Sequence, residues 1–363
     1  MKASQFVASS IAVAAAAFAG SAAAADVTGE VFGDFRWSVN HFDAKGAPAD
    51  DASATNNNSH YGIRATTTER GITGFVVYER QLDNDSGATA ELARQGYVGI
   101  SSAFGTALYG RAATAYKLAG ERLDPFFNTG IATISGASNV GAGAAILGPS
   151  YGLSALTSET AGNGFINNQI AYTTPSFAGL SFNAAVFLDE GTGPAEDHDY
   201  GAGLEYKAAG LTAGVQHLDI NSGVAVGSTQ NFGAIGIAAG ATAELTATRL
   251  YGSYDANGAW GGSASWEKLD LKGGLADRDY YYAAVWATVV PGTRVALAYG
   301  DTNETPFEGS SISVGIFHDV LSNLTAYAVA RSTDIDTDRG NTDPQAISLG
   351  LNYQFSLSGK GKI

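Results

Sequence analysis

Strict alternation of side chains near the end of the chain limits the possible folds more than any other feature. Over residues 345–355, every second side chain is apolar and those between are small or polar. Successive side chains of a strand point to opposite faces, so this segment predicts a strand with one apolar face. The apolar set is Ile347, Leu349, Leu351, Tyr353 and Phe355. A tilted membrane-spanning strand of roughly 9–11 residues fits this pattern, as does an amphipathic strand of a soluble β-sandwich.

The first 25 residues predict a secretory signal. Lys2 precedes a short apolar core, and the small residues up to Ala25 offer a cleavage site. This core is too short for a spanning helix, and no later run approaches the roughly 20 apolar residues that such a helix needs. We therefore expect an exported chain without a helical anchor, beginning at Asp26.

Composition narrows the class of protein further. The chain has no cysteine, so an exported form must be stabilised by backbone pairing and packing. The formal net charge is −15 and becomes −16 when Lys2 is removed with the signal. So acidic a surface disfavours nucleic acid as a partner. Mean hydropathy is near zero, which a membrane barrel also gives, because its lipid-facing and lumen-facing residues alternate.

Alternating segments recur along the chain, joined by two kinds of connector. Seven connectors are short and nearly uncharged, at residues 70–73, 102–105, 175–179, 207–210, 255–258, 291–293 and 321–323. Six are longer and mostly acidic, at residues 43–59, 83–87, 189–199, 270–279, 301–309 and 334–343. Short turns on one rim and long loops on the other indicate an outer-membrane β-barrel.

The connectors also predict the number of strands. Seven turns join seven pairs of strands, and one strand lies at each end, which gives an antiparallel barrel of 16 strands. Residues 221–243 fit either a loop or an extra hairpin, so 18 strands are the alternative. The sheet must close, because open edges are not tolerated in lipid.

One connector, residues 112–164, is far longer than the rest and only weakly charged. So long a loop is uncommon and usually functional. A barrel of this size leaves an aqueous lumen, and a loop folded into it would narrow the passage.

Several segments together resemble the general diffusion porins of Gram-negative bacteria. Residues 60–74 (HYGIRATTTERGITG) are similar to the second strand, turn and third strand of that family. Residues 94–111 (RQGYVGISSAFGTALYGR) resemble its most recognisable block. Asp124-Pro125-Phe126 follows where the constriction loop begins, and residues 168–179 (NQIAYTTPSFAG) resemble the strand after it. The resemblance covers residues 26–355, so we divide the chain into a signal (1–25), a porin barrel (26–355) and a C-terminal extension (356–363).

The resemblance implies a homotrimer of 16-stranded barrels, each with its third loop folded into the lumen and with basic wall residues facing acids on that loop. Carried over position by position, the wall residues are Asp34, His60, Arg64, Arg94 and Arg111, and the loop acids are Glu121 and Asp124. Asp34 and His60 stand where the best-known members have cations, which weakens the expected row of positive charge.

Two further residues belong to the expected constriction. Arg36 lies near the wall residues, and Glu79 lies on the inward face of the third strand. The positive and negative groups of the ring are then close to balanced, so the acidic outer loops decide which ions are concentrated. We predict weak cation selectivity that diminishes as ionic strength rises.

One acidic loop resembles a calcium site. Asp334, Asp336 and Asp338 follow the spacing of the first calcium ligands, but Gly340 is one place late and Gln345 stands where a bidentate glutamate is needed. A solvated loop explains the pattern as well. These residues are weak candidates for Ca²⁺ or Mg²⁺, which would bridge the loops to lipopolysaccharide, and no other cofactor is expected.

The function predicted is a water-filled outer-membrane channel for passive diffusion of small hydrophilic solutes and ions, surrounded by outer-membrane lipid and lipopolysaccharide. A pore specific for sugars or other nutrients is the alternative if the aromatic residues at 260, 266, 280–282 and 286 line the lumen instead of the membrane interface. His217 and Asp219 suggest an outer-membrane hydrolase, but no Gly-x-Ser-x-Gly elbow accompanies them, so we predict no enzymatic activity.

Overall fold

The structure is a computed structural model of the whole chain. It describes residues 26–43, 50–82, 92–133, 164–188, 199–225, 242–271, 278–302, 307–337, 340–343 and 345–362. The predicted signal, residues 1–25, lies outside the described residues, as does part of every acidic connector. The division into signal, barrel and extension therefore stays a prediction.

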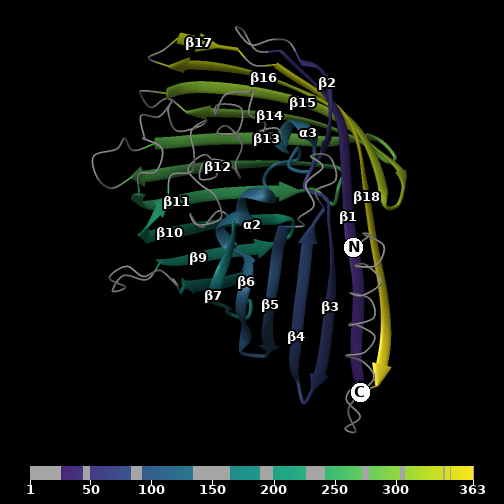
Figure 1. Cartoon of the computed structure of the whole chain (residues 1–363), viewed down its shortest axis with the longest axis vertical. Helices are drawn as coiled ribbons and strands as arrows, with labels where there is room; N and C mark the ends of the chain where they lie inside the picture. Colours follow the sequence, from purple (N-terminus) through teal and green to yellow (C-terminus); the bar gives the residue numbers. More distant parts are fainter. Residues whose placement is uncertain are drawn as a thin grey trace.

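The described residues form a single antiparallel sheet with two short helices (Figure 1). The first strands are β1 (Asp26–Asp43), β2 (Asp50–Asn56), β3 (His60–Glu69), β4 (Ile72–Gln81), β5 (Leu92–Ser102), β6 (Gly105–Ala113), β7 (Phe165–Thr173), β8 (Leu180–Phe187) and β9 (Asp199–Ala208). The remaining strands are β10 (Leu211–Ala225), β11 (Thr242–Asp255), β12 (Trp260–Leu271), β13 (Arg278–Val290), β14 (Thr293–Thr302), β15 (Phe307–Leu321), β16 (Leu324–Thr337), β17 (Gly340–Thr342) and β18 (Gln345–Lys362). The helices are α2 (Ala115–Glu121) and α3 (Gly130–Thr133).

These segments make a closed barrel of 16 strands, because two barrel strands are each built from two segments. β2 and β3 pair with successive parts of β1, so together they form the second barrel strand. β17 and β18 likewise pair with successive parts of β16 and form the last one. The barrel closes where β1 pairs with β18, from Asp26 opposite Lys362 to Asp43 opposite Gln345. The prediction of 16 strands is confirmed, and the 18-stranded alternative is not.

The residues predicted as a C-terminal extension continue the last strand. β18 runs without a break past Phe355, and Ser356 to Lys362 pair with Phe32 to Asp26 of β1. This part of the chain therefore belongs to the seam that closes the barrel.

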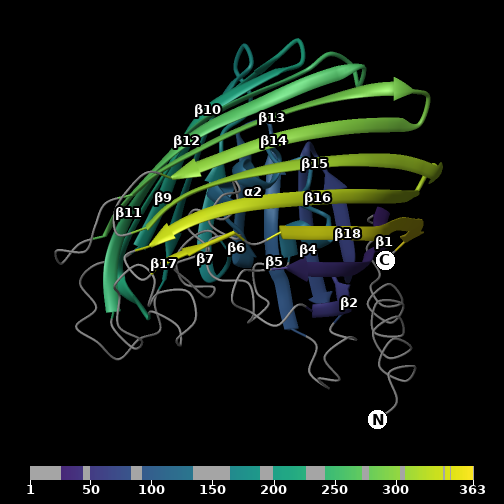
Figure 2. The same cartoon turned by 90° about the horizontal axis from the view of Figure 1, so that it is seen from above.

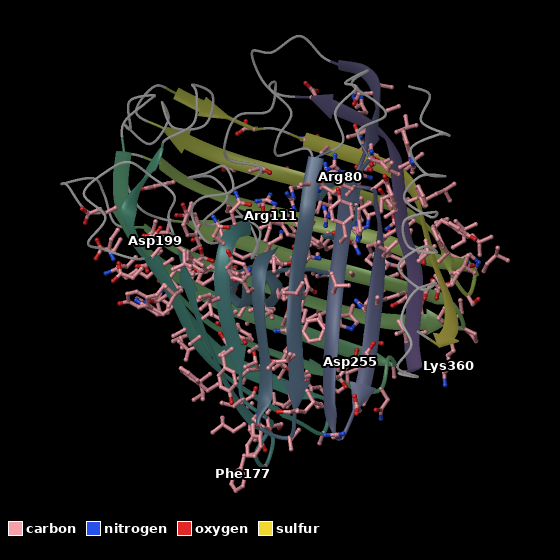
Figure 3. All side chains as sticks on the ribbon, turned by 60° about the horizontal axis from the view of Figure 1, so that its bottom comes forward. Arg80, Arg111, Phe177, Asp199, Asp255 and Lys360 are labelled. Atoms are coloured by element: carbon pink, nitrogen blue, oxygen red, sulfur yellow. The ribbon has the colours of Figure 1, made fainter. Side chains whose placement is uncertain are left out.

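Each of the seven predicted turns joins two neighbouring strands. Four of these turns place two consecutive residues at positive φ, at Arg70–Gly71, Ala178–Gly179, Ala209–Gly210 and Asn257–Gly258. Such pairs are typical of tight hairpins, because their twist matches that of the flanking strands, and glycine adopts positive φ at no steric cost. Figure 3 shows Phe177 and Asp255, which lie at two of the short turns, at the end of the barrel away from Arg80 and Arg111.

The outer surface carries the apolar side chains. In β18, Ile347, Leu349 and Leu351 are 53%, 58% and 52% exposed, whereas Ser348 between them is 0% exposed. The same alternation in β1 exposes Val39 and buries Ser38 and Asn40. Exposed apolar surface of this extent suits lipid better than water.

The long connector folds into the barrel, as predicted. Its described part after β6, residues 114–133, is named the inner loop here and contains α2 and α3 (Figures 1 and 2). α2 packs against β9 and β10, and α3 against β1, β16 and β18. Among the described residues, no helix is long and apolar enough to cross a membrane.

Candidate functional site

The inner loop begins with a capped helix. Thr114 has an extended backbone and its hydroxyl accepts a hydrogen bond from the Lys117 N–H at 3.1 Å, which satisfies one free donor of the first helical turn. Lys117 and Glu121 then form an ion pair one turn apart along α2. Glu121, predicted as a constriction acid, is therefore paired on its own helix.

The wall holds the inner loop mainly through backbone carbonyls. Side chains from four barrel strands donate to carbonyl oxygens spaced along the loop. The pairs are Arg249 to Tyr116 (2.7 Å), Ser263 to Leu123 (2.5 Å), Asn352 to Asn128 (2.9 Å) and Arg331 to Ile131 (3.1 Å). Because every residue has a carbonyl, these bonds fix the path of the loop independently of its side chains.

Phe126 attaches the middle of the inner loop by packing. It is fully buried and lies 5.9 Å from Phe317, measured between ring centroids. A side chain at Gly315 would meet the Phe126 ring, so the absence of a Cβ there makes room for the aromatic contact. Ile131 belongs to the same buried cluster, which therefore joins the inner loop to β13–β16.

Asp124, the second predicted loop acid, points into the wall. One carboxylate oxygen accepts hydrogen bonds from the Phe126 N–H and the Tyr282 hydroxyl, each at 2.9 Å. Burial raises the pKa of this carboxyl, and the nearby positive charge of Arg331 opposes that rise. Asp124 thus attaches the loop to β13, and the residue is only 5% exposed.

A buried ion pair lies behind α2. The Arg249 guanidinium donates to Glu267 Oε2 from Nε at 2.8 Å and from Nη2 at 2.5 Å, and it stacks over the Tyr116 ring at 4.2 Å. The side chains are 0% and 2% exposed. Because both side chains are buried, the pair supports the helix without lining the water path.

On the β1 wall, Asp34 and Arg36 form a close pair. The Arg36 Nη2 atom lies 2.5 Å from Asp34 Oδ2, which also accepts a hydrogen bond from Gln354 at 2.9 Å. Both residues are less than 10% exposed. The positive charge of Arg36 is therefore matched at once by its neighbour.

Arg64 and His60 lie on β3. Arg64 donates to Glu30 Oε2 at 3.0 Å, and both side chains remain partly exposed in the lumen. The His60 ring nitrogen Nδ1 lies 3.0 Å from the Asn58 carbonyl oxygen. Arg64, like Arg36, is thus paired with an acid. Its partner Glu30 was not among the predicted site residues.

Irregular pairing turns Arg94 toward Glu79. The register of β4 and β5 shifts at this point, so that Arg94 has no direct partner across the pair. Arg94 Nε donates to Glu79 Oε1 at 2.5 Å, and Gln95 donates to Glu79 Oε2 at 3.1 Å. Bulges of this kind often redirect a side chain at a functional position.

Arg111 occupies a second register shift, between Gly110 and Ala112. Its guanidinium donates to the carbonyl oxygens of Ala93 (3.1 Å) and Phe165 (2.6 Å) and to Asn167 (3.0 Å). It is placed toward the end of the barrel that carries the long connectors (Figure 3).

One aromatic ring brings the wall and the inner loop together. The cations of Arg94, Lys117 and Arg111 lie 4.7, 5.3 and 6.0 Å from the centroid of Phe165. Glu79 and Glu121 neutralise two of them. Lys117 was not predicted, although its spacing from Glu121 is visible in the sequence; Phe165 carries no such local signal.

The remaining predicted residues lie elsewhere. Asp334 and Asp336 are part of β16, opposite Ser310 and Glu308, and Asp338 lies outside the described residues. Among the described residues no cluster of three or more acids, histidines or cysteines is arranged to hold a metal. The acidic loops are described only in part, so their binding of divalent ions stays a prediction.

His217 and Asp219 are on the outer face of β10, alternating with the buried Gln216 and Leu218. His217 contacts the Thr248 hydroxyl at 2.8 Å, and Asp219 accepts a hydrogen bond from Tyr200 at 2.9 Å. Neither contact joins the two residues to each other.

The aromatic residues divide between the two faces. Trp260 and Tyr281 are exposed outward, as predicted for interface residues, but Tyr280 and Tyr282 are buried and Trp286 packs against the cluster around Phe126. Their inward rings are covered, so that they do not form an open stacking surface.

Comparison with known proteins places these features in context. The sequence model of the Gram-negative porin family matches residues 10–358. A search of curated proteins finds no match.

Solved porin structures share the fold. The anion-selective porin from Comamonas acidovorans superposes with a TM-score of 0.70 at 19% identity, covering 91% of this chain and 100% of its own. The outer membrane protein OmpT of Vibrio cholerae in its trimer form gives 0.62 at 14% identity, covering 91% and 99%. OmpF of Salmonella typhi in complex with daunomycin gives 0.59 at 16% identity, covering 91% and 97%.

Proposed function

Because this chain belongs to the Gram-negative porin family, a multi-pass β-barrel of the outer membrane, we propose that it is a passive channel for small hydrophilic solutes and ions. The inner loop supports this proposal. It crosses the lumen, narrows it and is fixed to the wall at many points, as a permanent constriction requires. Solutes then pass between the inner loop and the opposite wall.

We further propose weak cation selectivity. The observation that carries it is the pairing of three wall arginines with acids, Arg36 with Asp34, Arg64 with Glu30 and Arg94 with Glu79. A wall of paired charges has little net field, so the acidic connectors at the mouth set the preference. One porin of similar fold is described as anion-selective, which makes the sign the point to test.

A nutrient-specific pore is a weaker proposal. It needs aromatic faces open to the lumen, whereas Tyr280 and Tyr282 are each 7% exposed. Absence of enzymatic activity is also part of the proposal, and the outward position of His217 and Asp219 supports it, because neither faces the solute path.

The assembly proposed is a homotrimer surrounded by outer-membrane lipid and lipopolysaccharide. Closed symmetry is usual for homo-oligomers, and the V. cholerae protein of similar fold is described in a trimer form. Native mass spectrometry of protein released into mild detergent measures the number of chains. A monomer under all such conditions contradicts the trimer but leaves the channel proposal intact.

Single-channel recording tests the function. Purified protein in a planar bilayer should give stepwise, ohmic conductance, and a KCl gradient should give a small reversal potential of the sign for cations. The potential should shrink as both solutions are made more concentrated, because the Debye length falls from about 10 Å at 0.1 M to about 3 Å at 1 M. Complete lack of conductance would reject the channel, whereas an anion-selective potential would reject only the proposed sign.

A further inference from the structure

The second barrel strand is interrupted where its sequence gives no proline or glycine. β2 ends at Asn56 and β3 begins at His60, and the three residues between them are Asn57, Asn58 and Ser59. Asn58 has a φ of 60°, a conformation that asparagine tolerates better than most residues. Asn57 is turned into the barrel and is fully buried. The break therefore serves to place an amide side chain inside the wall.

The Asn57 side chain reaches across the seam of the barrel. Its Nδ2 atom lies 3.0 Å from Ser38 Oγ of β1 and 3.0 Å from the Tyr327 hydroxyl of β16. Ser38 donates in return to Asn57 Oδ1 at 3.2 Å. The amide thus connects the second barrel strand with β1 and with β16, which lies on the other side of the last strand.

The same Tyr327 hydroxyl receives the inner loop. The N–H of Gly130, the first residue of α3, donates to it at 3.0 Å. One oxygen atom therefore accepts from the inner loop and from the interrupted strand. Tyr327 itself is 5% exposed and packs 6.1 Å from Phe317, between ring centroids, so its own position is set by the wall.

Gly130 fits this place because it has no side chain. A Cβ there would meet three side-chain oxygens, those of Asn40, Ser348 and Ser38. All three belong to β1 and β18 and are buried. The wall around Gly130 is therefore a closely fitting seat for the end of the inner loop.

We propose that this junction of Asn57, Tyr327 and Gly130 determines the width of the channel at its constriction. The inference rests on the proposed function, since it concerns the path along which solutes pass. The Tyr327 hydroxyl sets the distance between the Gly130 segment of the inner loop and the opposite wall. Asn57 holds that hydroxyl in place. Both are positioning residues, because both are buried and neither lines the water path.

Attachments on either side keep the loop inside when the junction is lost. Asn352 holds the Asn128 carbonyl and Arg331 holds the Ile131 carbonyl, so only the segment between them is released. We therefore expect a loop that fluctuates at its seat, and a barrel that stays folded. Single-channel recording detects such a state as extra conductance sublevels.

The test replaces the two side chains separately. Tyr327→Phe removes the oxygen that accepts both hydrogen bonds. Asn57→Ala removes the amide that donates to that oxygen. Losing one buried hydrogen bond shifts an equilibrium by up to about tenfold, so the fraction of time in sublevels should rise by about that factor in each variant. The control is Tyr97→Phe, which makes the same chemical change on β5, where the ring packs edge-on against Phe75.

A double-mutant cycle separates positioning from general weakening. Once the hydroxyl is gone, Asn57 keeps its bonds to Ser38 but no longer acts on the inner loop. Tyr327→Phe with Asn57→Ala should therefore show the same fraction of time in sublevels as Tyr327→Phe alone. Combining Asn57→Ala with Tyr282→Phe, which releases the separate attachment at Asp124, should give additive effects. Gly130→Ala disturbs the seat sterically and keeps the inference testable if Tyr327→Phe does not fold.

The outcomes distinguish the inference from the function. The inference alone is overturned if the wild-type protein conducts and the variants do not differ from it. The variants are Tyr327→Phe, Asn57→Ala and Gly130→Ala, and the readouts are conductance, sublevels and exclusion of graded polyethylene glycols. Equal changes in the Tyr97→Phe control overturn it as well. A wild-type protein that does not conduct overturns the proposed function, on which the inference depends.

Discussion

Asp124 accepts a hydrogen bond from the Tyr282 hydroxyl at 2.9 Å, although 158 positions separate them in the sequence. The contact turns an acid expected at the constriction into an attachment of the inner loop. It also leaves a buried carboxylate whose ionisation is unfavourable, because burial raises its pKa.

This carboxylate should make stability depend on pH. The pKa of this carboxyl is higher in the folded protein than in the unfolded chain, where it is near 3.8. Its stabilising contribution is therefore fully present below the unfolded-state pKa and is lost as pH rises through the folded-state pKa. Asp124→Asn keeps an oxygen acceptor and cannot ionise. We expect it to match the wild type at low pH and to unfold at a higher temperature at neutral pH. Asp343→Asn, at an exposed acid, is the control. An unfolding temperature difference that is the same at pH 3 and pH 7 contradicts the assignment.

The buried pair behind α2 should be sensitive to loss of one partner. Arg249→Met leaves Glu267 charged and buried without its guanidinium, which typically costs about 3–5 kcal/mol. Arg249→Met combined with Glu267→Leu removes both charges and should cost less. Urea unfolding of the folded barrel measures both free energies. A double variant at least as unstable as the single one would mean that the bond from Arg249 to the Tyr116 carbonyl matters more than the ion pair.

Selectivity should respond to Glu79. Glu79→Gln removes the carboxylate that Arg94 contacts, so the constriction becomes more positive. One unit charge about 10 Å away in water contributes roughly 0.4 kcal/mol, or about two-fold, to each ion. Because the effect is opposite for cations and anions, the cation-to-anion permeability ratio should fall by about four-fold. Reversal potentials in dilute KCl measure it. Glu69→Gln, at an exposed acid that ends β3 beside the first short turn, is the matched control and should change the ratio less.

The outward apolar face should behave as a lipid contact. Leu349 is 58% exposed, and Leu349→Arg would place a charge against lipid. Such a substitution near the bilayer centre costs about 2–4 kcal/mol, whereas Leu349→Ala should cost much less. Folding into lipid vesicles in a urea series gives both values. Equal stability of the arginine and alanine variants would show that this face meets water.

Much of the fold follows from local pattern. The alternation at Ser348 and Leu349 is a property of one strand, and a tight turn such as Arg70–Gly71 is encoded by a few neighbouring residues. Strand number, the two faces and the folding-in of the long connector were therefore predicted correctly. The break at residues 57–59 was not, because Asn57, Asn58 and Ser59 contain no glycine or proline to mark a turn.

The site depended much more on tertiary structure. The sequence alone determined which residues face the lumen, since a period of two follows from strand geometry. It did not determine that Arg94 meets Glu79 through a register shift, or that Tyr327 holds Gly130 from 197 positions away. Those contacts depend on how sixteen strands are staggered when β1 pairs with β18, and closure of the barrel is a property of the whole chain.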